Sequence, residues 1–138
     1  MTALLVAAAM FGVLAIAVSL KPSRSGVGTH QGLGFQGCDF LTRTGLPCPS
    51  CGMTTSFAWF VRGNWIASFY VQPMGFVLAI MTGTVFWAAL YIALTGRPIQ
   101  RLLRQLNGAW LIAALMGFGI AAWGWKIFIH LRGIDGWH

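Results

Sequence analysis

The chain has 138 residues, of which 57% are hydrophobic and only 8% are charged. In soluble domains about a quarter of the residues are charged. This composition therefore excludes an ordinary water-soluble domain and predicts folding within a lipid bilayer. Nine Lys and Arg residues against two acidic residues give a net charge of +7. Because the basic residues flank apolar segments, we expect them to contact anionic lipid headgroups and expect no binding of nucleic acid.

The first predicted element is a membrane-spanning helix over residues 1–20, which carry no charged side chain. At about 1.5 Å per residue, such a run matches a hydrocarbon core of about 30 Å. Lys21-Pro22 ends the run. A cleaved signal peptide is the alternative, supported by Ala15-Ile16-Ala17, but the basic segment that usually begins such a peptide is missing. We therefore predict that this helix is retained.

Residues 21–51 are predicted to form a loop, because glycines recur here without a helical or strand period. All three cysteines of the chain lie in or at the end of this loop. The glycines of Gly32-Leu-Gly34-Phe-Gln-Gly37 match the dinucleotide-binding string by letter, but no strand pattern precedes them and no helix pattern follows. We interpret that match as chance.

A short amphipathic helix is predicted directly after the loop, over residues 52–62. Met53 and Phe57 recur at helical spacing on one face, while Thr54 lies elsewhere on the helix. A helix of this length is too short to cross a bilayer, so we expect it to lie in the plane of the membrane interface. Gly63-Asn64 ends it, and an apolar, aromatic segment follows.

Two further membrane spans are predicted over residues 73–95 and 109–131. Pro73 suits the first turn of its helix, where a missing N–H costs nothing. Between the spans, the arginines at 97, 101 and 104 recur at helical spacing and predict a basic amphipathic connector. The positive-inside rule favours a cytoplasmic connector, and therefore an extracytoplasmic cysteine loop.

Each of these two spans carries a stripe of small residues on one face. The stripes consist of Gly75, Ala79 and Gly83 in one span and of Ala109, Ala113, Gly117 and Ala121 in the other. Close approach of backbones drives helix association in lipid, so we predict that the stripes pack against each other, with a face for another subunit as the alternative. Near the end of the last span, Lys126 and His130 lie one turn apart. We expect Lys126 to extend to the headgroups, over the alternative that both line a path through the membrane.

The segment Cys48-Pro-Ser-Cys51-Gly52 pairs two thiols at the expected start of a helix. Such a pair can bind a metal, cycle between dithiol and disulfide, or form a structural disulfide within a turn. The exposed N–H groups at a helix start favour a thiolate, so we expect Cys51 to be the sulfur with the lower pKa. These features assist metal binding and redox exchange alike and do not decide between them.

A zinc site is the first interpretation of the cysteines. A closed structural zinc site needs four ligands, and Cys38, Cys48 and Cys51 supply three. His30 is the nearby histidine that would complete the set, and Asp39 is a weaker candidate. The sequence thus predicts a candidate zinc site formed by these residues.

Redox exchange between Cys48 and Cys51 is the second interpretation. The βαβ pattern of thioredoxin-like enzymes is missing around the motif, so that fold is excluded. In an oxidising compartment, Cys38 could instead form a structural disulfide with Cys48 or Cys51, which would leave one odd thiol.

The motif also carries a family resemblance. The segment Thr44-Gly45-Leu46-Pro47-Cys48-Pro49-Ser50-Cys51-Gly52-Met53-Thr54 resembles the signature of the domain-of-unknown-function 2752 family, which comprises small, mostly bacterial membrane proteins. The family pattern continues with an aromatic-rich helix, a Gly-Asp/Asn turn and an Asn-Pro before a membrane span. Arg62-Gly63-Asn64-Trp65 and Gln72-Pro73 occupy those places.

The resemblance implies that Gly52, Thr54 and Pro73 are motif positions and that the protein is a bacterial integral membrane protein. The chain departs from the family pattern at Thr55, where the family usually has Arg, and at Gln72, where it usually has Asn. A guanidinium beside the thiols would stabilise thiolates or bind an anion, so its absence argues against such a role here.

We therefore predict an all-α membrane protein that forms one domain over residues 1–138, with three spans and a short interfacial helix after the cysteine motif. The favoured function is a non-enzymatic accessory or assembly component of a membrane complex, built around a structural or zinc-binding knuckle. The alternative is a membrane thiol–disulfide oxidoreductase that uses Cys48 and Cys51. The scarcity of carboxylates and histidines favours the non-enzymatic role. Expected partners are the lipid bilayer and other membrane subunits or a second copy, and the expected location is the inner, cytoplasmic membrane.

Overall fold

The computed structural model describes residues 2–29, 31, 34, 36–96, 108–134 and 136–137, and the structural statements below concern these residues. Within them the chain forms six helices and no strand. The helices are α1 (Thr2–Ser19), α2 (Asp39–Thr44), α3 (Met53–Phe60), α4 (Trp65–Val71), α5 (Pro73–Thr95) and α7 (Gly108–Leu131). Three of them, α1, α5 and α7, are long and apolar enough to cross a membrane. The predicted all-α architecture with three spans and a short helix after the cysteine motif is confirmed.

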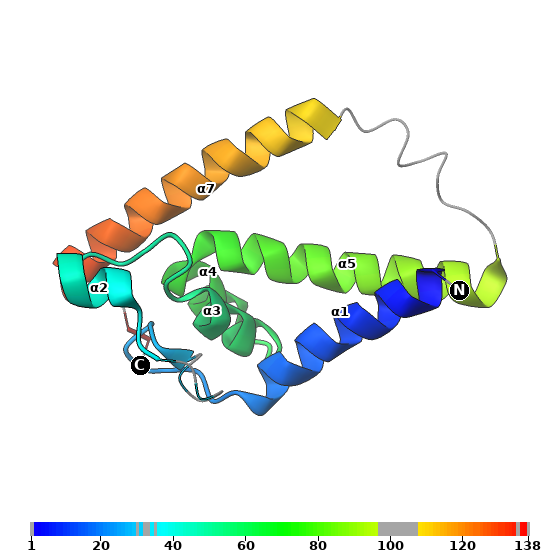
Figure 1. The fold of residues 1–138 in the computed structure, drawn as a ribbon, viewed down its shortest axis with the longest axis horizontal. Coiled ribbons are helices and arrows are strands. Elements are labelled where there is room, and N and C mark those ends of the chain that lie inside the picture. The colour runs from blue at the N-terminus through cyan, green and yellow to red at the C-terminus, as the bar shows by residue number, and fades with distance from the viewer. Residues whose placement is uncertain are drawn as a thin grey trace.

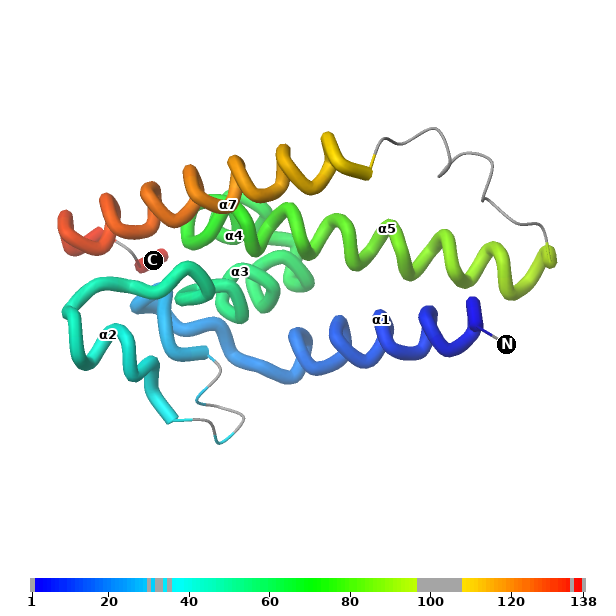
Figure 2. Tube along the Cα trace, turned by 45° about the horizontal axis from the view of Figure 1, so that its top comes forward, coloured from blue at the N-terminus to red at the C-terminus, as the bar shows by residue number. Residues whose placement is uncertain are grey.

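The first two spans, α1 and α5, lie side by side along much of their length (Figures 1 and 2). Their buried residues include Ala7 and Ala17 on α1 and Ala79 and Ala89 on α5. Small side chains let two helices approach closely, which is a main source of helix association in lipid. Large apolar side chains on the outer faces remain exposed, as expected for helices that contact acyl chains.

The third span, α7, diverges from α5 so that its Gly108 end lies far from the other spans (Figure 1). Its buried residues, Ala122, Lys126 and Ile129, all lie in its C-terminal half. The four small residues of its predicted stripe are exposed. A Cβ added at Gly83 or at Gly117 would meet nothing within 4 Å.

The prediction that the two stripes pack against each other is therefore wrong. The physical reason is that small residues permit close approach without specifying the neighbour. The stripe on α5 is used against other elements: a Cβ at Gly75 would lie 2.8 Å from Cβ of Ser56 on α3. The position of α7 is set by polar contacts near its C-terminal end, described below.

The two short helices α3 and α4 pack against each other and against the start of α5. Ser56 Oγ donates to the carbonyl of Ser68 at 2.8 Å, and Ser68 Oγ donates to the carbonyl of Ser56 at 2.8 Å. Both residues are fully buried. Helix α3 is slightly shorter than the predicted 52–62, and the apolar segment after it, for which no helix was predicted, is the separate helix α4.

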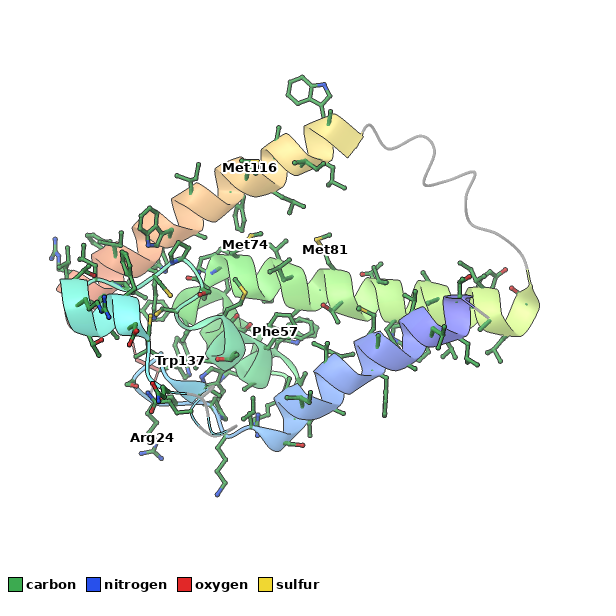
Figure 3. The ribbon with its side chains drawn as sticks, viewed as in Figure 1. Arg24, Phe57, Met74, Met81, Met116 and Trp137 are labelled. Atoms are coloured by element: carbon green, nitrogen blue, oxygen red, sulfur yellow. The ribbon has the colours of Figure 1, made fainter. Side chains whose placement is uncertain are left out.

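Pro73 occupies the first turn of α5, as expected. The predicted loop 21–51 contains one unpredicted element, α2, which begins after Cys38 and ends at Gly45. A six-residue helix is too short to leave a periodic pattern in the sequence. At the other end of the chain, Trp137 N donates to the carbonyl of Arg24 at 3.2 Å, so the C-terminal segment lies against the loop after α1 (Figure 3).

Some predictions fall outside the described residues. They concern the basic connector with arginines at 97, 101 and 104, half of the glycine string at 32–37, and the predicted ligand His30.

Candidate functional site

The structure brings the sulfurs of the three cysteines together. Cys38 Sγ lies 3.4 Å from Cys48 Sγ, which in turn lies 3.1 Å from Cys51 Sγ. All three sulfurs lie within 4.8 Å of one another, and all three thiols are free. The fourth ligand predicted from the sequence, His30, lies outside the described residues. We call Cys38, Cys48 and Cys51 the cysteine cluster.

Helix α2 and a tight turn bring the sulfurs into contact. Cys38 is the residue before α2, and Gly45 ends that helix in the left-handed conformation with φ of 71°, which turns the chain back. In the motif itself, Cys51 N donates to the carbonyl of Cys48 at 2.9 Å, and Met53 N donates to the carbonyl of Ser50 at 3.1 Å. Two consecutive turns therefore carry the chain from the first motif cysteine into α3.

Gly52 is required by this geometry. Its φ of 85° lies in the left-handed region, which favours glycine. A Cβ at this position would lie 2.7 Å from the carbonyl oxygen of Gly26, so the loop after α1 packs directly on the motif backbone. Both the conformation and the close approach exclude a side chain here.

Two side chains from other elements hold the motif carbonyls. Gln72 Nε2 donates to the carbonyl of Pro49 at 2.9 Å, and Trp123 Nε1 of α7 donates to the carbonyl of Pro47 at 2.9 Å. Gln72 is fully buried between α4 and α5. The spans thus fix the position of the motif through backbone-directed hydrogen bonds.

Lys126 of α7 contributes a third contact of this kind. Its side chain is fully buried, and Nζ donates to the carbonyl of Gly26 at 3.2 Å. Nζ also lies 3.3 Å from where a Cβ of Gly52 would be. The prediction that Lys126 extends to the headgroups is therefore wrong, because a backbone carbonyl of the loop accepts its hydrogen bond inside the protein. The recurrence of Trp123 and Lys126 on one helix face was the available sequence signal.

The segment that contains the cysteine cluster matches a known family. Residues 38–87 match the family described as Protein of unknown function (DUF2752). The resemblance drawn from the motif is confirmed over this segment. The matched segment begins at Cys38, so it contains the whole cysteine cluster together with α3 and α4. No curated protein and no solved structure matches the chain.

The two departures from the DUF2752 pattern have structural counterparts. Thr55, in place of the usual Arg, is fully buried and its Oγ1 lies 2.6 Å from Oγ1 of Thr29. Thr29 Oγ1 also accepts from Ser23 N at 2.9 Å, so the loop after α1 is held against α3 by hydroxyl groups. Gln72, in place of the usual Asn, retains a side-chain amide and uses it on Pro49. The contact between Thr29 and Thr55 was not evident from the sequence.

The two motif thiols differ in acidity. Burial raises the pKa of Cys48, but its hydrogen-bond contacts with Ser50, Cys51 and Cys38 outweigh that effect and lower the pKa to about 7. Burial, together with the contacts to Cys48 and Cys38, raises the pKa of Cys51 to about 12. The expectation that Cys51 has the lower pKa is therefore wrong. Cys51 is buried, and desolvation destabilises its thiolate more than the nearby helix start stabilises it.

A cavity of about 480 Å³ adjoins the cysteine cluster. Its apolar walls come from α1 and α3, including Val13, Ile16 and Leu20 on α1 and Met53 and Phe57 on α3. The three cysteines line the same cavity, together with the motif residues Ser50 and Thr54. The sulfurs thus face a mostly apolar space.

Proposed function

We propose that the cysteine cluster is a metal-binding knuckle, that zinc is the metal, and that the protein is an accessory or assembly component of a membrane complex. The observation that carries the proposal is the approach of three free sulfurs to within 4.8 Å of one another. With Zn–S bonds of about 2.3 Å, sulfurs around a tetrahedral zinc lie roughly 3.8 Å apart. The separations of 3.1 and 3.4 Å would need to open by about 0.4–0.7 Å to reach that spacing.

The donor set suits zinc because thiolates are soft ligands, and Cys48 loses its proton near neutral pH. Three thiolates would give the site one negative charge in excess of the zinc. His30 remains the proposed fourth ligand. Bound there, zinc would cross-link the residue before α2 to the turn before α3.

An accessory role accounts for the surface of α7. Its stripe of small residues stays exposed although it lies on a membrane span. Such a face suits another membrane subunit or a second copy of the chain. Chemical crosslinking in the native membrane tests this part: a crosslink through a cysteine placed at Ala113 supports a helical neighbour, and its absence at every small position of α7 counts against one.

Metal analysis of the full chain tests the knuckle. Protein purified in detergent under reducing conditions should carry about one zinc ion per chain. The Cys48→Ser and Cys51→Ser variants should lose it, whereas Ser50→Ala, a change between the two ligands, should retain it. Zinc content in the wild type no higher than in the cysteine variants would eliminate the proposal.

Thiol–disulfide exchange is a second candidate, favoured by the contrast between a partly exposed Cys48 and a buried Cys51 at 3.1 Å. The Cys48 thiolate would attack a disulfide of a partner, forming a mixed disulfide and releasing one partner thiolate. Cys51 would then attack Cys48 Sγ, closing the Cys48–Cys51 disulfide and releasing the second partner thiol. The partner disulfide is reduced and the motif dithiol is oxidised.

The Cys38→Ser variant separates the two candidates. It removes a ligand from the metal site but leaves the exchanging pair intact. Equilibration of this variant with a series of glutathione ratios, followed by mass spectrometry, should yield a Cys48–Cys51 disulfide if exchange is the function. If that disulfide forms at no glutathione ratio in the wild type or in Cys38→Ser, the redox candidate fails.

The proposed location is the inner membrane, with the cysteine cluster outside the cytoplasm. The support is the placement of arginines at 97, 101 and 104 between two spans, which the positive-inside rule assigns to the cytoplasm. A membrane-impermeant maleimide applied to intact cells should label the cluster from outside. Labelling only after the membrane is opened would reverse the orientation.

A further inference from the structure

We propose that the cavity between α1 and α3 binds an acyl chain of a membrane lipid, and that the bound chain controls access to the cysteine cluster. This inference stands on the cavity and its walls, whether or not the cysteines hold a metal. It assigns to the protein a lipid-binding site in addition to the knuckle.

The shape of the cavity fits a hydrocarbon chain. Its wall on α1 runs from Val13 to Leu20, or about 10 Å at 1.5 Å per residue. An alkyl chain, about 4–5 Å across from carbon contact distances, can lie along this wall within the cavity of about 480 Å³.

The chemistry of the walls also fits an acyl chain. Val13 and Ile16 line the cavity and are 42% and 50% exposed, so the cavity is open on the side of a span that would face lipid. The wall from α3 adds Met53 and Phe57, which are apolar as well. The hydroxyl groups of Ser50 and Thr54 line the same space and can donate hydrogen bonds to ester oxygens.

A bound chain would shield the sulfurs, because all three cysteines line the cavity that it fills. Polar alkylating agents, oxidants and chelators would then reach the cysteine cluster more slowly while the chain is bound. The lipid environment would thereby set the reactivity of the thiols.

Photolabelling in lipid nanodiscs tests the binding site. The probe is a phosphatidylcholine with a diazirine in one acyl chain, and labelled peptides are mapped by mass spectrometry. Wild-type protein should be labelled within residues 13–20 and 53–57 above the rest of α1. Val13→Trp, which fills the cavity, should lower that labelling at least about five-fold, as expected for a filled hydrophobic pocket.

The control is Val6→Trp, because Val6 lies on the same helix with the same 42% exposure but does not line the cavity. This variant should be labelled like the wild type. Uniform labelling along α1, or equal labelling of the two variants, would overturn the proposal. A third outcome is a crosslinked dimer in place of lipid labelling. If Val13→Trp abolished that dimer, the cavity would belong to a second copy of the chain, and the proposal would also be overturned.

The shielding is tested on metal-free protein, so that a failure of the zinc proposal leaves this result unaffected. Iodoacetamide should alkylate Cys48 at least about five-fold more slowly in lipid-loaded than in lipid-depleted detergent micelles, since the thiol must be reached for reaction. In Val13→Trp, adding lipid should change the alkylation rate of Cys48 little. In Val6→Trp, adding lipid should slow alkylation as it does in the wild type. A rate unchanged by lipid in the wild type would refute control of access.

Discussion

The pair of spans α1 and α5 and the region around the cysteine cluster are held together by different forces. The buried residues of α1 are Ala7 and Ala17, and those of α5 beyond its first turn are Ala79 and Ala89. In the described part of the chain, buried polar or charged side chains are found instead in the loop after α1, in α3, in α4 and its C-cap, and in the C-terminal half of α7. These residues are Thr29, Thr55, Ser56, Ser68, Gln72 and Lys126.

This difference shows how a mostly apolar chain can build one precise site. Apolar contact between helices in lipid tolerates many arrangements, because lipid tails are as apolar as the side chains they replace. A buried hydrogen-bonding group tolerates few arrangements, because leaving the group unpaired costs free energy. The arrangement around the cysteines is therefore specified by polar contacts, and changes there should cost more than changes along the spans.

The largest effect is expected for Gly52→Ala. The substitution places a side chain at a φ of 85° and against the carbonyl of Gly26, so the knuckle should lose about 3 kcal/mol or more of stability. Thermal unfolding in detergent and zinc content measure it. An unfolding midpoint equal to that of the wild type would contradict the packing of the loop on the motif.

Lys126→Met should follow, with a loss of about 1.5–3 kcal/mol, because it removes a charged donor and leaves the Gly26 carbonyl buried. The measurement is the same unfolding experiment. The matched control is Lys21→Met, which changes the exposed lysine that follows α1 and should leave the unfolding midpoint close to that of the wild type. Equal losses for the two variants would show that Lys126 acts only as a surface charge.

Two glycines on spans compare the regions directly. Gly75→Ala should destabilise the protein by about 1–2 kcal/mol, since the added Cβ would lie too close to Ser56 on α3, the helix that follows the cysteine motif. Gly117→Ala on α7 should leave stability unchanged or slightly higher, because its Cβ would meet nothing and alanine is the better helix former. The reverse order would break the comparison.

The smallest structural perturbation is a change of pH. In metal-free protein, alkylation of Cys48 should fall as pH drops below about 7, since the thiolate is the reactive form and its pKa is about 7. Cys51, with a pKa raised to about 12, should stay protonated and slow up to pH 9. Peptide mass spectrometry of iodoacetamide adducts gives both rates. Faster reaction of Cys51 than of Cys48 at pH 8 would invert the assignment.

The sequence predicted those features that depend on long apolar runs or on a local motif. The spans followed from length and hydrophobicity, Pro73 from its fixed backbone angle, and the family resemblance from the cysteine motif. The short helix α2 was missed because six residues leave no period. The neighbours of the small-residue stripes were assigned wrongly. A small residue permits the close approach of another helix but does not identify that helix.

The site itself was predicted in part. The sequence named the three cysteines, but it could not show that Lys126 turns inward. A lysine near the end of a span can reach headgroups or a backbone carbonyl, and only the position of the Gly26 loop decides between them. The acidity of the two motif thiols was misjudged for a similar reason. Burial depends on the surrounding fold and not on the spacing of the motif.

The shared centre formed by Cys38, Cys48 and Cys51 is the central feature of the proposed function. X-ray absorption at the zinc edge, measured on the full chain in lipid nanodiscs, reports the ligands around the metal. We predict a shell of three sulfurs at about 2.3 Å with one lighter ligand at about 2.0 Å. A shell of oxygen and nitrogen alone, or a spectrum unchanged by Cys38→Ser, would contradict it.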